Sequence, residues 1–244
     1  MSHTDTALGA AEDEIPLSPA LHRQLVAEFL GSALLVTVVV GSGIAAQSLS
    51  PADTGIQLLE NSLATALGLL VLILAFGPVS GAHFNPVVTL ASVLADRRDG
   101  VRAMSPSSVS GYLVAQVCGA VLGAVLANVM FGETTELSSN DRTSFEHLVA
   151  EVVATAGLIL VIFTLTRTGR GVLAAPAVGA YIGAAYWFTS STSFANPAVT
   201  VGRMFSDTFA GIAPESVPPF VLAQVLGGAV GIGVVLYLYP RRED

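Results

Sequence analysis

The chain has 244 residues, of which 52% are hydrophobic and only 11% are charged, whereas about 25% of the residues in a soluble globular domain carry a charge. Its mean hydropathy of +0.70 excludes a disordered chain. Ten basic residues, all of them arginine, against 18 acidic ones give a net charge of −8, which excludes a nucleic-acid-binding protein. A lone cysteine, Cys118, permits neither an internal disulfide nor a cysteine-based metal site.

Six apolar stretches are long enough, allowing for tilt, to cross a bilayer as helices. They are continuous and lack the period-two alternation of a membrane β-barrel. A polar, acidic N-terminal tail (1–23) precedes them and a short C-terminal tail (240–244) follows them. The sequence thus predicts an all-α membrane protein with spans at about 24–46, 61–78, 108–131, 146–166, 173–190 and 217–239.

The arginines orient the predicted spans. Two of them, Arg142 and Arg203, lie on the outer side if the N-terminus is cytoplasmic, and the other eight then lie on the cytoplasmic side. The positive-inside rule favours this arrangement strongly. We therefore expect a multi-pass protein of the cell (inner or plasma) membrane with both termini in the cytoplasm.

Two further apolar pieces, about 85–95 and 196–204, each begin at an Asn-Pro pair. Eleven helical residues reach roughly 16 Å, which is about half of a hydrocarbon core. Backbone that enters a membrane without crossing it survives only where protein buries it or water reaches it. These pieces are predicted to be two re-entrant half-helices.

The two halves of the chain repeat each other, as repeat 1 (about 24–131) and repeat 2 (about 146–239). Each half contains three spans, so the second copy enters the membrane from the opposite side. Such inverted repeats place a shared site near the midplane. The matching landmarks are Ala27-Glu28 with Ala150-Glu151, Asn85 to Thr89 with Asn196 to Thr200, and Ala115-Gln116-Val117 with Ala223-Gln224-Val225.

The Asn-Pro pairs carry the predicted chemistry. Asparagine caps a helix N-terminus, and proline suits the first helical position. Half-helices that start at Asn85-Pro86 and Asn196-Pro197 aim two positive dipole ends at the centre, where they repel cations and protons. The asparagine amides can donate to a neutral solute that has lost its water.

The segment Ser80-Gly81-Ala82-His83-Phe84-Asn85-Pro86-Val87-Val88-Thr89 resembles the first signature of the aquaporin (major intrinsic protein) family, with Val87 where alanine is usual. The segment Phe194-Ala195-Asn196-Pro197-Ala198 resembles the second. The resemblance covers about residues 24–239 as one channel domain. It implies six tilted helices, two half-helices, one pore per subunit and usually a homotetramer.

Four polar residues inside predicted spans fall where that family repeats such residues: Glu28, Glu151, Gln116 and Gln224. A carboxylate within a span costs about 2.5–3.5 kcal/mol on insertion scales, so each glutamate should be buried against protein partners. The resemblance implies that they hold the loops leading to the Asn-Pro pairs, and a proton relay is the alternative. His83 is expected to lie at the cytoplasmic pore mouth, with a merely packed histidine as the alternative.

The chain departs from the family at the outer selectivity filter, where an arginine usually follows the second Asn-Pro-Ala. Val199 occupies that position, and Arg203 lies one helical turn further on the same face. Arg203 is expected either to supply a displaced cation at the vestibule or to pack against a loop. By spacing from the motifs, Thr65 and Ser193 are further filter members. The fifth-helix member is Ala184 if counted from Asn196 and Tyr186 if counted from Ala177.

These features predict a passive channel for water and small uncharged solutes that excludes ions and protons. Filters without arginine resemble a bacterial branch linked to arsenic handling, which adds arsenite and methylated arsenicals to glycerol-like polyols as candidate solutes. An ion- or proton-coupled secondary transporter is the alternative, although the midplane breaks offer no carboxylate. The sequence offers no catalytic pair, metal cluster or cofactor motif, so we expect no enzyme, cofactor or metal, and no partners beyond solutes, lipid and further subunits.

Overall fold

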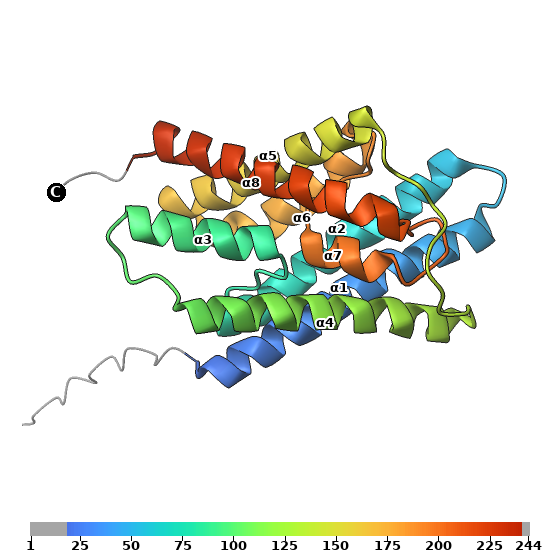
Figure 1. The fold of residues 1–244 in the computed structure, drawn as a ribbon, viewed down its shortest axis with the longest axis horizontal. Helices are drawn as coiled ribbons and strands as arrows, with labels where there is room; N and C mark the ends of the chain where they lie inside the picture. Colours follow the sequence, from blue (N-terminus) through green and yellow to red (C-terminus); the bar gives the residue numbers. More distant parts are fainter. Residues whose placement is uncertain (1–18, 241–244) are drawn as a thin grey trace, which may run out of the picture.

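A computed structural model describes residues 19–240, so residues 1–18 and 241–244 of the two predicted tails lie outside the described residues. All regular secondary structure in the described residues is helical (Figure 1). The elements are α1 (Leu21–Leu49), α2 (Thr54–Ser80), α3 (Pro86–Arg98), α4 (Pro106–Phe131), α5 (Phe145–Arg167), η1 (Gly171–Leu173), α6 (Ala174–Phe188), α7 (Pro197–Arg203), η2 (Pro214–Ser216) and α8 (Val217–Leu238).

Six helices in the described part are long and apolar enough to cross a membrane, which confirms the predicted spans: α1, α2, α4, α5, α6 with η1, and α8 with η2. The largest boundary difference is at α2, which begins at Thr54 instead of about residue 61. Asp53 caps it by accepting from the Ile56 N–H at 3.0 Å. Asn61 of the polar first turns is buried against α1, where it donates to the Val39 carbonyl at 2.8 Å.

The short helices α3 and α7 start near the middle of the molecule and run to opposite ends (Figure 1). They are the two predicted half-helices, of 13 and 7 residues. We call the end at which α3 finishes the inner end, and α1 begins and α8 finishes there too (Figure 1). The end at which α7 finishes is the outer end.

Glycines allow the long helices of each repeat to approach closely. A Cβ on Gly119 or Gly123 of α4 would lie 2.2 Å from a backbone carbonyl oxygen of α1. A Cβ on Gly227 or Gly231 of α8 would lie 2.5 Å from a carbonyl oxygen of α5. These small-xxx-small pairs therefore form the seams α1–α4 and α5–α8, in matching positions of the two repeats.

The outer surface of the bundle is apolar, as a helix facing lipid requires. Every third or fourth residue of α2 forms an exposed stripe: Leu59, Leu63, Leu67, Val71 and Leu74. Polar groups, by contrast, gather inside, where they surround the beginnings of α3 and α7. The fold thus reverses the distribution of a soluble protein and directs its polar chemistry to the centre.

Candidate functional site

A buried glutamate holds the backbone of the loop before α3. The carboxylate of Glu28, fully buried on α1, accepts from the Ser80 hydroxyl (2.7 Å), the N–H groups of His83 (2.9 Å) and Phe84 (2.7 Å), and the Gln116 amide (2.7 Å). Four donors satisfy both oxygens and so compensate for burying the group.

Glu151 repeats this arrangement before α7. It accepts from the Ser191 hydroxyl (2.6 Å), the N–H groups of Phe194 (2.9 Å) and Ala195 (2.8 Å), and the Gln224 amide (2.7 Å). The contacts are those of a loop-holding residue, and they occupy every oxygen that a proton relay would need.

Both loops contain residues with left-handed backbone that are not glycine. Ala82 and Phe84 have φ values of 50°, and their repeat mates Ser193 and Ala195 have 52° and 48°. Such conformations cost on the order of 1–3 kcal/mol each and persist where the surroundings impose them. The glutamates bind the N–H groups within these strained turns, and paired strain of this kind marks a functional site.

Four hydroxyl residues, whose roles sequence reasoning missed, complete the two networks: Ser80, Ser191, Thr89 and Thr200. The serines donate to the glutamates, and the threonines accept from the Gln116 and Gln224 amides at 3.0 and 2.8 Å. The threonines also donate to the carbonyls of Asn85 and Asn196. A signal was available, because both pairs recur at the 111-residue offset of the Asn-Pro motifs.

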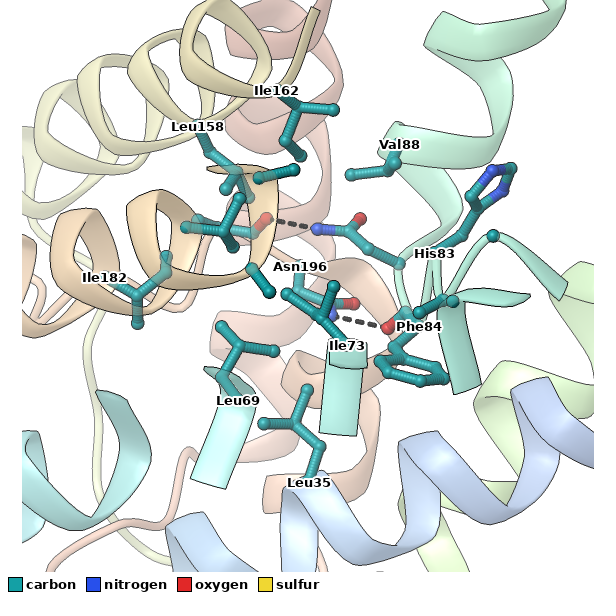
Figure 2. A pocket seen from close by; sticks show the side chains of 18 of the residues that line it. Leu35, Leu69, Ile73, His83, Phe84, Val88, Leu158, Ile162, Ile182 and Asn196 are labelled. Atoms are coloured by element: carbon teal, nitrogen blue, oxygen red, sulfur yellow. Dashed lines mark hydrogen bonds between the residues drawn. The ribbon is translucent and has the colours of Figure 1, made fainter. Parts of the chain in front are cut away.

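The asparagines cap the half-helices and join them. Asn85 Oδ1 accepts from the Val87 N–H at 2.9 Å, and Asn196 Oδ1 accepts from the Ala198 N–H at 2.9 Å. The amide of each donates across to the other repeat, from Asn85 to the Ala195 carbonyl (2.8 Å) and from Asn196 to the Phe84 carbonyl (2.7 Å) (Figure 2). One amide hydrogen of each asparagine remains for a solute, beside the positive ends of α3 and α7.

Val87, the departure from the first signature, packs away from this centre. A Cβ on Gly228 of α8 would lie 2.2 Å from Val87 Cγ1, so the glycine provides the room for the larger side chain. Its repeat mate Ala198 is fully buried. Val87 and Ala198 therefore support the half-helices from behind, as do Pro86 and Pro197 at their first positions.

We expect Gly228→Ala to lower the free energy of unfolding by about 1–3 kcal/mol, because the added methyl overpacks the contact with Val87. The double variant Val87→Ala with Gly228→Ala should recover most of this loss. Thermal unfolding in detergent measures both. Gly233→Ala, in the same helix with no atom within 4 Å of the new Cβ, is the control. A double variant no more stable than Gly228→Ala would contradict the packing argument.

A cavity of about 610 Å³ passes between α3 and α7. Both asparagines line it at the centre, and most of its wall is aliphatic (Figure 2). The wall includes Leu35, Leu69, Ile73, Leu158, Ile162 and Ile182, from four of the long helices. An apolar wall with few polar groups offers a solute hydrogen bonds along one side only.

Four of the predicted filter residues come together at the outer end of this cavity: Thr65, Tyr186, Ser193 and Val199. The hydroxyls of Thr65 and Tyr186 lie 3.1 Å apart and form a hydrogen bond. Ser193 Oγ is buried without a hydrogen-bond partner among the described residues. Val199 is only 5% exposed and contributes an apolar side chain to the lining of the same cavity.

Of the two candidates for the fifth-helix position, Tyr186 lines the cavity, whereas Ala184 is exposed on the outside of α6 and does not line it. The count from Asn196 differs because it passes through residues 189–196, an irregular loop that carries no helical register. The count from Ala177 stays within α6. That helix is fixed against α2 at Gly179, where a Cβ would lie 2.6 Å from the Ala66 carbonyl oxygen.

Arg203 lines the cavity near its outer end and is 2% exposed, so its side chain is buried in the protein. Its guanidinium carbon lies 3.5 Å from the centroid of the Phe194 ring, and its Nε donates to the Ala210 carbonyl. Side chains on a helix lean toward its N-terminus. The guanidinium thus reaches back along α7 to the loop before it.

His83 lines the inner end, together with Ser92 and Asp96 of α3. Its Nδ1 lies 3.1 Å from Thr89 Oγ1, and its ring packs 5.5 Å from that of Tyr112. The imidazole is therefore both packed and directed to the cavity wall. In residues 19–240 no group of three or more His, Cys, Asp or Glu side chains is arranged to hold a metal ion.

Two loops are bound to each other at the outer end of the molecule. Asp207 accepts from the Ser139 N–H at 2.8 Å, and this hydrogen bond lowers the pKa of the Asp207 carboxyl. Arg142 donates to the carbonyls of Gly211 (2.7 Å) and Phe209 (3.0 Å), and burial lowers the pKa of its guanidinium. These bonds tie the loop before α5 to the loop after α7.

Comparison with known proteins agrees with this architecture. The family described as major intrinsic protein matches residues 17–193. The aquaglyceroporin AqpS of Rhizobium meliloti (strain 1021) is 44% identical, over 91% of this chain and 93% of its own. A glycerol uptake facilitator protein of Pseudomonas aeruginosa is 30% identical over 92% and 91%. The X-ray structure of the aquaglyceroporin from Plasmodium falciparum shares the fold, with a TM-score of 0.64 and 21% identity over 90% and 96%.

Proposed function

Because the chain belongs to the major intrinsic protein family, whose members are membrane channels and not enzymes, we propose that its solutes cross through the cavity between α3 and α7. The protein is a channel for water and small neutral solutes such as glycerol. The observation that carries the proposed path is the pair of asparagines, each capping one half-helix and bound to the opposite loop within one cavity.

At the centre, a solute exchanges its water for the asparagine amides. Both half-helices direct the positive ends of their dipoles there, which disfavours cations and protons. The aliphatic part of the cavity wall offers no hydrogen bonds, so a passing solute forms them only on the side of the asparagines. Glu28, Glu151, Gln116 and Gln224 act by holding the loops and touch no solute, and residues 24–239 form the channel domain.

At the outer end, Thr65, Tyr186, Ser193 and Val199 form the selectivity filter. Valine in place of arginine leaves room beside three hydroxyl groups, which suits a solute that carries several hydroxyls. Glycerol and the neutral trihydroxide of arsenic share this character. Methylated arsenicals carry methyl groups in place of hydroxyls and so form fewer hydrogen bonds. His83 lies at the cytoplasmic pore mouth.

The proposal extends to the assembly and the orientation, for which the resemblance to the family and the distribution of the arginines are the support. The protein forms a homotetramer in the cell membrane, with a pore in each subunit. Both termini are cytoplasmic, because Arg97, Arg98, Arg102, Arg167 and Arg170 lie in or beside elements that finish at the inner end.

A panel of solutes in proteoliposomes tests the proposal. Stopped-flow light scattering should show water and glycerol flux, and arsenite uptake should exceed that of empty vesicles. All fluxes should be unchanged when ion and proton gradients are imposed. Transport that requires a gradient would instead identify a coupled secondary transporter, and flux that persists after Asn85 and Asn196 are both replaced by leucine in a folded protein would exclude the path.

A further inference from the structure

Arg203 is a buried charged residue of α7 whose counterpart in the other repeat carries no charge. The two half-helices match at an offset of 111 residues, so Val88 corresponds to Val199 and Ser92 to Arg203. All four line the cavity. A serine is sufficient at this position in α3, and the packing of a half-helix does not therefore require an arginine.

The residue on which the Arg203 guanidinium packs also differs between the two repeats. Phe194, on which Arg203 stacks at 3.5 Å, corresponds to His83 in the inner loop. A guanidinium on an aromatic face is a favourable cation–π pair. The phenylalanine and the arginine occur together at the outer end, whereas the matching positions at the inner end hold His83 and Ser92. The Nε bond to Ala210 fixes the direction of the guanidinium.

The charge of Arg203 has no carboxylate partner among residues 19–240, where the recorded ion pair joins Arg167 to Asp99. Glu151 and Arg142 are the ionisable groups, besides Tyr186, that act on it electrostatically. Glu151 is already saturated by four donors, and Arg142 carries the same sign. Asp207, four residues further along the chain, binds Ser139 instead. A buried charge is costly without a counterion. Because no carboxylate neutralises the guanidinium, its positive field extends into the outer end of the cavity.

We propose that Arg203, seated on Phe194, is the residue that excludes cations at the outer filter, in place of the arginine missing at position 199. The proposal rests on the proposed conduction path. Its guanidinium reaches the filter from the second turn of α7, which leaves the space beside Val199 free for a hydroxylated solute. Val199 thereby sets the width of the filter and Arg203 sets its charge, whereas a single arginine at position 199 would determine both.

Arg203→Gln tests this assignment in proteoliposomes. The ratio of proton and sodium leak under an imposed potential to water flux, measured on the same vesicles, should rise at least about tenfold in the variant. Moving the charge, in the double variant Val199→Arg with Arg203→Gln, should restore exclusion. A folded Arg203→Gln channel with unchanged water flux and no added leak would overturn the proposal. Absence of water and glycerol flux in the unmodified protein would instead count against the conduction path.

Arg203→Lys carries the test if the glutamine variant does not fold. Lysine, unlike arginine, can lose its proton, and burial makes that loss easier. The lysine channel should therefore exclude sodium less well at pH 10 than at pH 7, while the unmodified channel should not change. Exclusion by the lysine channel that matches that of the unmodified channel at both pH values would overturn the proposal.

Discussion

Glu151→Gln should abolish the folded channel or reduce it to a small fraction of the protein recovered. The carboxylate accepts four hydrogen bonds, two of them from the backbone of the strained loop before α7. A glutamine offers one oxygen, and it points an amide at groups that are themselves donors. Each buried donor left unpaired costs about 1–3 kcal/mol, and at least two are left here. Size-exclusion chromatography and thermal unfolding in detergent measure the loss.

The same argument applies to Glu28→Gln in the other repeat, whose carboxylate has the same four kinds of donor. Glu133→Gln is the matched control, because Glu133 is exposed in the loop after α4. It should leave stability and water flux unchanged. A monodisperse Glu151→Gln protein with the unfolding temperature of the control would show that the glutamate does not hold the loop.

The architecture could be predicted because the membrane restricts what an apolar stretch can do. Backbone polar groups in lipid must bond internally, so length and hydropathy alone identify spans. The half-helices were predictable for a second reason. A stretch of 11 residues cannot cross, and an Asn-Pro pair caps a helix in either repeat, as Asn85 and Asn196 do.

Geometry that depends on loops could not be predicted in this way. Tyr186 and Ala184 are two residues apart, and the irregular segment 189–196 between α6 and α7 breaks the helical count that would distinguish them. The hydroxyls of Ser80 and Ser191 belong to the same loops, and their roles depend on left-handed turns that no helical or strand period reveals.

Long side chains are a second source of error. The spacing predicts that Arg203 lies one turn beyond Val199 on the same face of the helix, and both residues do line the cavity. Spacing did not reveal that the guanidinium extends back to the Phe194 ring, because that depends on an aromatic residue nine positions earlier in the chain. The charge and the backbone that carries it thus lie at different depths.

Val199→Arg should change the size selectivity of the channel more than any other single substitution in the filter. Val199 faces the cavity beside the Thr65–Tyr186 hydroxyl pair and the unpaired Ser193 hydroxyl. An arginine there fills the space and can donate to Ser193. The ratio of glycerol to water permeability should fall about tenfold, which corresponds to about 1.4 kcal/mol of added barrier. Stopped-flow swelling of matched proteoliposomes, with arsenite uptake beside it, measures the ratio.

The half-helix should tolerate this change. The cap bonds from Asn196 Oδ1 reach the backbone N–H groups of Ala198 and Val199, which the new side chain does not alter. Arginine is also a good helix former. The risk lies in Arg203, whose guanidinium already occupies the outer end, so two like charges would repel in a site of low dielectric. Val199→Arg with Arg203→Ala separates the effects, since it keeps one charge and should still show the lowered ratio. Val199→Leu adds bulk without a charge or a donor and should lower the ratio less. A ratio that stays at the unmodified value in both arginine variants, with water flux intact, would mean that Val199 lies outside the constriction.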